Sequence, residues 1–267
     1  MAKSKRRVST LMTAVREKGN VMRAVMLRDM RTRFFDHGLG FLLVSIWPLA
    51  HMAILLIIYS STGRQAPYGE GLNVFFATGL IPTLLFMYVS RFMSLSLILN
   101  RPLMAFPAVH VTDILFARAI LEAIAAAITL LMMFIILIVS GDDPRPIDTV
   151  QAVLCYLSTL LLAVGVGSLA GVIVMFMPFF ATIYALSMVV VYISSGTLFV
   201  TAALPERVAD ALAWNPVTQA VEWMRTAYFE TYPDRLIDKT YLVSVGLGCL
   251  CLGLLLERLL RRTMIES

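Results

Sequence analysis

The chain has 267 residues, of which 59% are apolar and 15% charged, and its formal net charge is +5. Soluble domains are about 45–50% apolar and about 25% charged. A chain of this size could not hide so much apolar side chain from water. The composition therefore excludes a soluble enzyme, a disordered chain and a disulfide scaffold, and it indicates an integral membrane protein.

Residues 20–36 are predicted to form an amphipathic helix, because Met22, Met26 and Met30 recur every four positions while arginines occupy the other positions. Such a helix lies in the inner interface, with its apolar stripe in acyl chains and its arginines on lipid phosphates. It is either a topology anchor or a lateral gate beside the first span. The residues assigned to this gate or interfacial helix are Arg28, Asp29, Arg31, Arg33 and Phe34.

Five segments carry no charged side chain over 17 residues or more: 40–59, 72–90, 123–141, 149–205 and 240–256. A helix rises 1.5 Å per residue, so about 20 residues cross a hydrocarbon core of about 30 Å. The fourth segment is too long for one crossing and is expected to fold back near Met177-Pro178. We predict an all-α membrane protein with a cytoplasmic N-terminus (1–39) and a six-span domain (40–267). The predicted spans are 40–60, 72–92, 114–139, 150–176, 180–200 and 241–258.

Of the 22 lysines and arginines, 16 lie in the segments 1–39, 91–118 and 258–262, and 6 lie in the segments on the other side of the spans. The positive-inside rule places these segments, and so both termini, in the cytoplasm. The same asymmetry accounts for the basic net charge, so no nucleic-acid partner is needed. Nothing before Gly40 has the apolar core of a signal peptide, and we expect no cleavage.

Motifs that would carry catalysis are missing from the sequence. It has no Gly-x-x-x-x-Gly-Lys-Ser/Thr loop for ATP, no His-Glu-x-x-His and no Gly-x-Ser-x-Gly. Cys155, Cys249 and Cys251 are interpreted as small residues within spans rather than metal ligands. We expect no metal site, no cofactor in this chain and no catalysis by the chain alone. Six spans without a clear internal repeat fit one half of a transporter driven by another subunit better than a secondary carrier.

The cytoplasmic loop 100–113 separates spans two and three. Pro102 and Pro107 bracket the apolar run 103–106. A compact, partly apolar loop can dock into a groove of a partner protein, and it can equally be an ordinary connector. The pattern alone leaves both interpretations open.

The outer segment 201–239 is expected to contain two short amphipathic helices, separated at Asn215-Pro216. Glu222 and Arg225 are three positions apart and can pair on the face opposite the apolar stripe. The two helices are either a re-entrant hairpin that lines a cavity or an interfacial cap held by tryptophans in the aromatic belt. The residues assigned to this outer gate are Trp214, Asn215, Glu222, Trp223 and Arg225.

Span three carries two charges, Arg118 and Glu122, four positions apart. A lone charge at the bilayer centre costs about 2.5–3.5 kcal/mol on insertion scales. These two either offset one another on one helix face or sit in a wet cavity near the inner surface. Gly167 and Gly171 give span four a smooth strip for close helix packing.

Four groups of residues occur in order along the chain. The first group is Leu27-Arg28-Asp29-Met30-Arg31-Thr32-Arg33-Phe34 with Gly38-Leu39-Gly40 and Trp47-Pro48-Leu49, and the second is Phe76-Ala77-Thr78-Gly79-Leu80-Ile81-Pro82. The third is Asn100-Arg101-Pro102-Leu103 with Phe106-Pro107-Ala108-Val109 and Asp113. The fourth consists of Ser195-Gly196, Leu204-Pro205 and Trp214-Asn215-Pro216 through Glu222 and Arg225. Together they resemble the motifs of bacterial polysaccharide-export ABC transporter permeases, which are membrane subunits of type-2 exporters. The resemblance runs from about residue 20 to the end and looks closest to the capsular-polysaccharide branch.

The resemblance implies a homodimer of twelve spans that carries two copies of a separate cytoplasmic ABC ATPase, where Mg-ATP is bound. It implies that loop 100–113 holds the coupling helix, that 20–36 is a gate helix and that 201–230 closes the outer end of a channel. In a Gram-negative host, a periplasmic co-polymerase and an outer-membrane export channel would complete the path. The coupling residues implied are Asn100, Arg101, Leu103, Phe106 and Val109.

The implied function is export of lipid-linked capsular polysaccharide across the bacterial inner membrane. Aromatic rings suit a glycan pore because they stack on sugars without fixing them, although many aromatics in membrane proteins belong to the belt and core. The candidate translocation path is Phe76, Phe86, Tyr88, Phe92, Arg118, Glu122, Tyr184 and Tyr192. The alternatives are a six-span ABC permease for O-antigen, teichoic acid or a small hydrophobic drug or lipid, and, from another class, a membrane glycosyltransferase.

Overall fold

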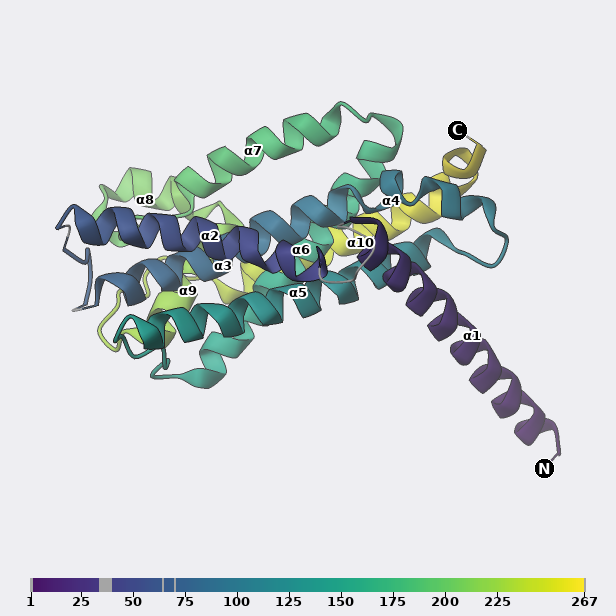
Figure 1. Ribbon diagram of the computed structural model, residues 1–267. Coiled ribbons are helices and arrows are strands. Elements are labelled where there is room, and N and C mark those ends of the chain that lie inside the picture. The colour runs from purple at the N-terminus through teal and green to yellow at the C-terminus, as the bar shows by residue number, and fades with distance from the viewer. Residues whose placement is uncertain (1, 34–39, 64, 70, 267) are drawn as a thin grey trace.

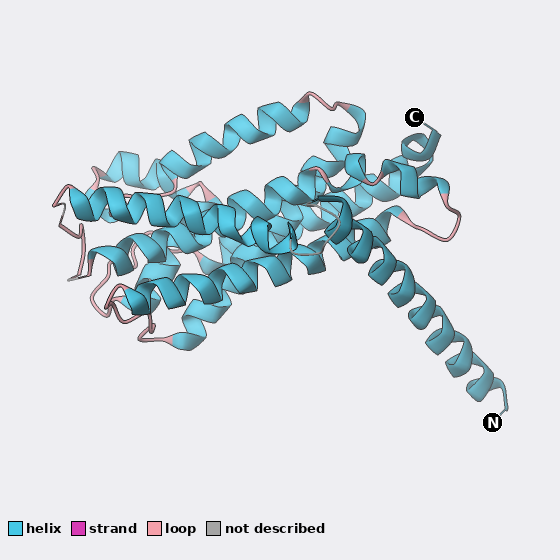
Figure 2. Ribbon diagram, in the orientation of Figure 1, coloured by secondary structure: helices cyan, strands magenta, loops and turns pink. Residues whose placement is uncertain are grey.

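A computed structural model describes residues 2–33, 40–63, 65–69 and 71–266, and within these ranges every regular element is a helix (Figure 2). In chain order they are α1 (Ala2–Arg33), α2 (Gly40–Ser61), α3 (Leu72–Ser94), α4 (Ser96–Leu99), the 3-10 helix η1 (Arg101–Ala105), α5 (Val111–Val139), α6 (Thr149–Phe176), α7 (Phe180–Ser194), the 3-10 helix η2 (Thr201–Ala203), α8 (Glu206–Ala213), α9 (Pro216–Tyr228) and α10 (Lys239–Glu266).

The long helices run side by side as a bundle with two distinct ends (Figure 1). Both termini and α4 lie at one end, called the inner end below, and α8 and α9 lie at the other, called the outer end. The N-terminal half of α1 projects away from the bundle at the inner end. An arrangement with both termini at one end fits the prediction that they lie on the same side of a membrane.

Each predicted span corresponds to a helix, and four helices in the described part of the chain are long and apolar enough to cross a membrane by themselves. They are α3, α5, α6 and α10. The apolar part of α2 that is described covers Ile46–Ser61, and α7 has 15 residues. At 1.5 Å per residue α7 is about 22 Å long, shorter than a hydrocarbon core of about 30 Å.

Two predicted boundaries differ from the structure. The fifth span was expected at 180–200, but α7 ends at Ser194 because Gly196 turns the chain with φ of +73°. The amphipathic helix was expected at 20–36, but α1 begins at Ala2, since residues 2–19 are mostly residues that favour a helix even without an apolar stripe. The position of Phe34 lies outside the described residues.

The centre of the bundle is α6, which packs closely against α3 and α10. A Cβ atom added to Gly165 would stand 2.3 Å from the Gly246 carbonyl oxygen of α10, and one added to Gly167 would stand 2.5 Å from Cβ of Met93 in α3. The predicted small-residue strip of span four is therefore confirmed as a packing surface. Backbones approach this closely only where side chains are absent.

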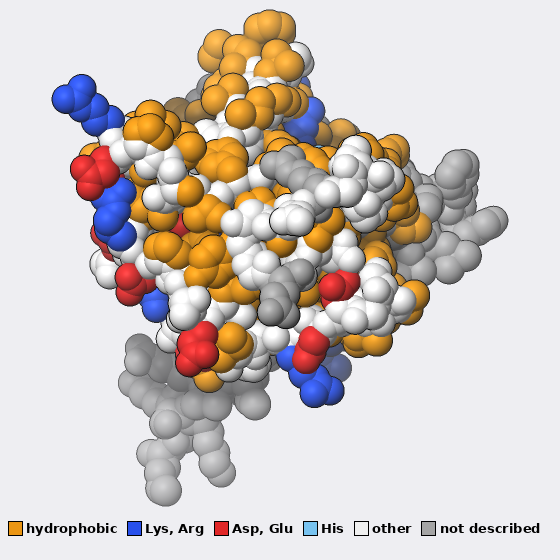
Figure 3. Space-filling model, turned by 90° about the vertical axis from the view of Figure 1, so that its left-hand side faces the viewer, with side chains coloured by type: hydrophobic (Ala, Val, Ile, Leu, Met, Phe, Trp, Pro, Cys, Tyr) orange, Lys and Arg blue, Asp and Glu red, His pale blue; other side chains and the backbone are white. Residues whose placement is uncertain are grey.

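The two helices of the outer segment differ in their surroundings. Most residues of α8 are exposed, whereas α9 is buried on nearly all sides between α3, α6 and α10. The face of α9 that carries Glu222 and Arg225 is buried as well, although it was expected to lie opposite the apolar stripe. Figure 3 shows the outer end, where acidic and basic side chains are spread among apolar and neutral ones.

Many large apolar side chains are exposed along the flanks of the bundle. Examples are Trp47 of α2, Ile138 of α5, Leu157 of α6 and Val190 of α7. An apolar surface of this extent would be unstable in water. It is the surface expected where helices meet lipid chains or another subunit.

Candidate functional site

A buried polar cluster at the inner end joins α1, the segment after α4, and α5. Asp29 of α1 is 6% exposed, and its Oδ2 accepts hydrogen bonds from Nδ2 of Asn100 and Nη1 of Arg118, both at 3.4 Å. Arg28 donates from Nη1 to Oδ1 of Asn100 at 2.9 Å. The N-terminal helix, the predicted coupling segment and the third predicted span therefore meet at one point.

Arg118 is the centre of this inner cluster. It is fully buried, forms an ion pair with Glu122 one turn further along α5, and its guanidinium carbon lies 5.3 Å from the ring centroid of Phe92. The predicted pairing of Arg118 with Glu122 is thus present. Removing one member of a buried ion pair typically costs about 3–5 kcal/mol, because the other charge is left uncompensated. The arginine consequently fixes α1, α3 and α5 relative to one another.

A second polar contact attaches α1 to the start of α5. Nζ of Lys18 lies 3.1 Å from Oδ1 of Asp113. Oδ2 of Asp113 accepts a hydrogen bond from the backbone N–H of His110 at 3.1 Å, which caps the first turn of α5. Lys18 and Asp29 are about 16 Å apart along α1 at 1.5 Å per residue. Two separated contacts hold this stretch of α1 in a fixed direction.

The five residues assigned to coupling divide into two groups. Asn100 is buried in the inner cluster, while Leu103 and Val109 are half-buried. Arg101 is exposed, and the Phe106 ring is 60% exposed. The segment thus exposes the apolar ring of Phe106 and the cationic side chain of Arg101, while the buried side chain of Asn100 contacts α1.

The residues assigned to the gate helix are also divided. Arg28 and Asp29 point into the inner cluster, whereas Arg31 is exposed. The side chain of Arg33 and the whole of Phe34 lie outside the described residues. The assignment of these residues to a gate remains a prediction.

Part of the predicted translocation path lies in the core of the single chain. Phe76 and Phe86 are buried, and the ring of Phe76 stacks on Tyr59 of α2 with centroids 4.5 Å apart. On α7, Tyr184 is buried, and the ring of Tyr192 lies 5.5 Å from His51 of α2. The ring contacts join α2 to α3 through Tyr59 and Phe76, and α2 to α7 through His51 and Tyr192. The line along which α2 meets these two helices is called the seam of α2, α3 and α7 below.

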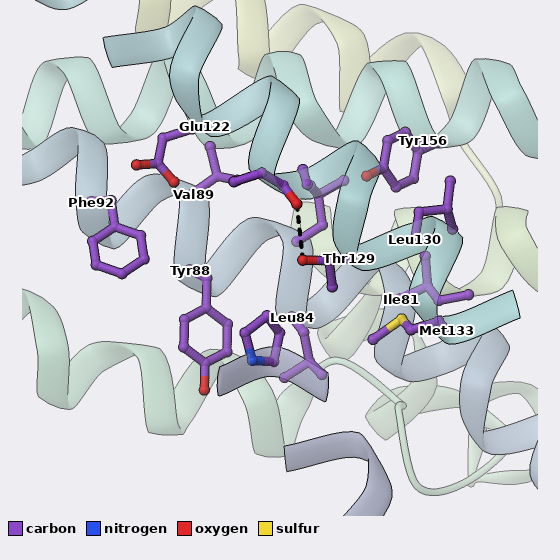
Figure 4. Close-up of a pocket in the computed structure, with 14 residues that line it drawn as sticks. Ile81, Leu84, Tyr88, Val89, Phe92, Glu122, Thr129, Leu130, Met133 and Tyr156 are labelled. Atoms are coloured by element: carbon purple, nitrogen blue, oxygen red, sulfur yellow. Dashed lines mark hydrogen bonds between the residues drawn. The ribbon is translucent and has the colours of Figure 1, made fainter. Parts of the chain in front are cut away.

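Tyr88, Phe92 and Glu122, three other residues of that path, line one small cavity at the junction of α3, α5 and α6 (Figure 4). Its volume of about 30 Å³ can hold a water molecule, which needs roughly 10–15 Å³. The hydroxyl of Thr129 faces the cavity and donates to the Ala125 carbonyl at 3.0 Å. The cavity brings these predicted residues together, and their contact with a glycan stays a prediction.

A second buried charge cluster lies at the outer end, around Arg225 of α9. The arginine donates from Nη2 to the Thr197 carbonyl at 2.9 Å and from Nη1 to the Phe199 carbonyl at 2.8 Å. Its guanidinium carbon lies 4.1 Å above the ring of Phe75 in α3, a cation–π distance. Arg225 therefore connects α9 to the turn after α7 and to α3.

Glu222 completes this outer cluster. Its Oε1 lies 3.7 Å from Nη1 of Arg225 and accepts a hydrogen bond from the Tyr232 hydroxyl at 3.1 Å. The predicted pair of Glu222 and Arg225 is thus present, at a distance that leaves it looser than a direct hydrogen bond. Burial raises the pKa of the Glu222 carboxyl, and the Arg225 guanidinium opposes that rise.

The other residues assigned to the outer gate have distinct positions. Oδ1 of Asn215 accepts from the Val217 N–H at 3.0 Å and caps α9, and its Nδ2 donates to Oγ of Ser194 at the end of α7 at 3.0 Å. Trp223 is buried, whereas Trp214 is 73% exposed. Asn215 is therefore a direct link between α7 and α9.

The sequence did not point to two members of these clusters, Tyr232 and Lys18. Tyr232 lies in a loop ten positions after Glu222, and Lys18 lies 95 positions before Asp113. No helical spacing relates such pairs. The only usable signal was that the carboxylates of Glu222 and Asp113 need hydrogen-bond donors if they are buried.

No family model matches the chain. It is 28% identical over 244 residues to the polysialic acid transport protein KpsM of Escherichia coli. The aligned region covers 91% of this chain and 95% of KpsM. It is 25% identical over 235 residues to the capsule polysaccharide export inner-membrane protein CtrC of Neisseria meningitidis, with 88% of each chain covered. The corresponding protein BexB of Haemophilus influenzae is 22% identical over 240 residues, covering 90% of this chain and 91% of BexB. Over most of its length the chain is homologous to inner-membrane proteins of capsule export.

Proposed function

We propose that this chain, as a homologue of capsule-export inner-membrane proteins, is the membrane-spanning subunit of an ATP-driven exporter that moves lipid-linked capsular polysaccharide across the bacterial inner membrane. The observation that carries the proposal is homology over nine tenths of the chain to three such proteins. The bundle supports it with four long apolar helices in its described part and apolar flanks.

The working unit in this proposal is a homodimer with six spans per chain and both termini in the cytoplasm. α2 and α7 expose many large apolar side chains and α7 is short, which favours cover by a second copy over full exposure to lipid. Two copies would then surround a channel along the seam of α2, α3 and α7, where Tyr192 and His51 meet.

The driving force would come from two copies of a separate cytoplasmic ABC ATPase, which bind Mg-ATP. The segment 100–109 is the docking site in this proposal, because Phe106 and Arg101 are exposed at the inner end. Exposed aromatic and arginine side chains are the residue types that most often dominate protein interfaces. A periplasmic co-polymerase and an outer-membrane channel would receive the polymer on the other side.

Movement of the docked segment would reach the membrane through the inner cluster. Asn100 contacts Asp29 and Arg28 of α1, and Asp29 contacts Arg118 of α5. A push on the segment would therefore shift α1 and α5 together. Such rigid-body shifts of packed helices are a common way of switching between two states.

The outer cluster would hold the outer end closed in the resting state. Arg225 binds the carbonyl groups of residues 197 and 199, and Asn215 binds Ser194. Opening would require α9 to separate from the turn after α7. The hydrogen bonds lost would be replaced by contacts with water in the channel.

The proposal is tested by expressing the chain in a capsule-deficient bacterium that lacks its own export permease, with and without the cytoplasmic ABC ATPase of a capsule exporter. Export is expected only when both are present, measured as polysaccharide on the cell surface. Accumulation of polysaccharide inside cells that lack the chain is the matching control. Surface polysaccharide without the chain, or turnover of a sugar donor by the purified chain alone, would contradict the proposal.

A further inference from the structure

A large groove lies between α5 and α6 near the outer end, and it contains none of the charged residues of the two clusters. Its volume is about 720 Å³, within the range of about 300–1,000 Å³ typical of small-molecule sites. α5 and α6 contact each other little along their length, although they are adjacent in sequence. The groove is the space that this separation leaves.

Two apolar stripes form the walls of the groove. Leu130, Phe134 and Ile138 are spaced by four along α5, and Val153 and Leu157 are spaced by four along α6. Side chains four apart lie on one face of a helix, so the stripes face the groove along about 12 Å of α5 and about 6 Å of α6. The shape is a slot that runs along the helices rather than a round pocket.

The floor of the groove comes from other parts of the bundle. Met224 and Tyr228 of α9, Ile81 of α3 and Tyr156 of α6 also line it. Ile81 and Tyr156 also line the small cavity of Figure 4. Ala152 is a further lining residue with a small side chain.

The groove opens onto the apolar flank of the bundle. Ile138, Val153 and Leu157 are all about half exposed or more, and their neighbours Ile135 and Leu154 are exposed on the same helices. In a membrane this flank contacts lipid, so an open apolar slot in it does not stay empty. A flexible hydrocarbon chain is the apolar group that lipid supplies.

The outer rim of the groove carries a pair of opposite charges. Arg145 is the one cation among the described residues that line it, and its side chain is 88% exposed. Nε of Arg145 lies 4.0 Å from Oδ1 of the exposed Asp143. This pair places one positive and one negative charge at the outer end of the groove. A headgroup with both a phosphate and an amine matches this rim better than a headgroup with a net negative charge.

We propose that the groove binds one acyl chain of a phosphatidylethanolamine molecule from the outer leaflet, with its phosphate at Arg145 and its amine at Asp143. The chain lies along the stripes of α5 and α6 and fills the space between them. The bound lipid keeps the outer ends of α5 and α6 apart and packs against Met224 and Tyr228 of α9. This inference concerns a lipid site and does not depend on the polymer that the protein exports.

The test uses the full chain reconstituted in vesicles of phosphatidylethanolamine and phosphatidylcholine. A trace of phosphatidylethanolamine carries a photoreactive diazirine near the end of one acyl chain, and the labelled peptides are identified by mass spectrometry. Labelling is expected on α5 between residues 130 and 138 and on α6 between 149 and 157. Val153→Trp is expected to reduce this labelling roughly tenfold, because a filled site excludes the chain.

The matched control is Leu154→Trp, which places the same ring on the exposed surface one position further along α6. Its labelling is expected to equal that of the unchanged chain. Ile138→Trp, with Val139→Trp as its control, repeats the comparison on α5 in case Val153→Trp does not fold. Equal labelling of the groove variants and their controls would overturn the proposal, since it would show ordinary surrounding lipid only.

The headgroup is tested with Arg145→Gln and with diazirine probes that carry phosphatidylcholine or phosphatidylglycerol. Phosphatidylethanolamine is expected to label the unchanged chain several-fold more than either probe, and Arg145→Gln is expected to remove that preference. Labelling by phosphatidylglycerol at or above the phosphatidylethanolamine level would overturn the headgroup assignment. A disulfide formed between two copies through Val153→Cys would overturn the lipid assignment itself, because the groove would then be a protein interface.

Discussion

Nη1 of Arg118 in α5 lies 3.4 Å from Oδ2 of Asp29 in α1, in the interior of the protein, although 89 positions separate the two residues in the sequence. Asp29 also accepts a hydrogen bond from Asn100, and Arg118 also pairs with Glu122 one turn further along α5. The segment after α4, where the ring of Phe106 is exposed, is thereby connected to α5 through buried side chains. Loss of any one member removes a contact from at least one buried polar or charged side chain.

Arg118→Leu is expected to lower the free energy of unfolding by about 3–5 kcal/mol, because Glu122 and Asp29 lose the buried positive charge that they share. The measurement is the thermal unfolding midpoint of the purified chain in detergent. The double variant Arg118→Leu, Glu122→Leu is expected to recover part of the loss, since an apolar pair can replace a buried ion pair at little cost. A double variant as unstable as the single one would contradict this account of the pair.

Asp29→Ala is expected to separate α1 from the coupling segment. Hydrogen bonds that involve a charged group contribute about 1.5–3 kcal/mol each, so a tenfold or larger loss of export is expected. Hydrolysis of ATP by the partner should continue, because the docking surface itself is unchanged. The control is Arg23→Ala on the exposed face of the same helix. If export survived Asp29→Ala, the path through the inner cluster would not transmit the movement.

Phe106→Glu is expected to weaken association with the ATPase by roughly 30-fold or more, the equivalent of an interface hot spot of about 2 kcal/mol. The exposed ring contributes little to the packing of the single chain, so membrane insertion should be unaffected. The measurement is the amount of ATPase that copurifies with the chain, together with surface polysaccharide. Phe106→Leu keeps an apolar side chain and is expected to retain most of both. Undiminished copurification with Phe106→Glu would remove this segment as the docking site.

Glu222→Lys is expected to abolish export, because it places a second cation beside Arg225 and removes the acceptor of the Tyr232 hydroxyl. Buried like charges that lack a counter-charge are strongly destabilising. Asp210→Lys on α8 is the control, since Asp210 forms an exposed ion pair with Arg235 and such pairs contribute about 0–1 kcal/mol. Surface polysaccharide is measured for both variants. Normal export by a folded Glu222→Lys protein would make the outer helices a passive cap.

Gly165→Ala is expected to destabilise the bundle by about 1–3 kcal/mol, because its methyl group would collide with the backbone of α10 at Gly246. Gly248→Ala is the matched control on α10, where an added Cβ meets nothing within 4 Å. That change is expected to be neutral or slightly stabilising, since alanine favours a helix by up to about 1 kcal/mol over glycine. Thermal unfolding midpoints of the two variants in detergent give the comparison. Equal effects would contradict close packing of α6 on α10.

Both local ion pairs, Arg118 with Glu122 and Glu222 with Arg225, could be predicted because helical spacing alone brings side chains three or four positions apart together. The six predicted spans likewise appear as helices, since uncharged runs are recognised along the chain without knowledge of neighbours. The end of α7 could not be placed, because the hydropathy of 195–200 continues the run while the backbone turns at Gly196. Hydropathy measures the preference of a side chain for lipid and does not record the backbone conformation.

The sequence by itself determined that this chain is a helical membrane protein, which segments are apolar enough to cross, and which of its motifs resemble capsule exporters, because these properties depend on local composition and order. The tertiary structure decided that Asp29 meets Arg118 and Asn100, that Tyr232 completes the cluster of Glu222 and Arg225, and that α5 and α6 part to form a groove. These features arise from packing between segments tens of residues apart. Packing selects partners by shape and by the need to satisfy buried charges, and no periodicity within one segment encodes that selection.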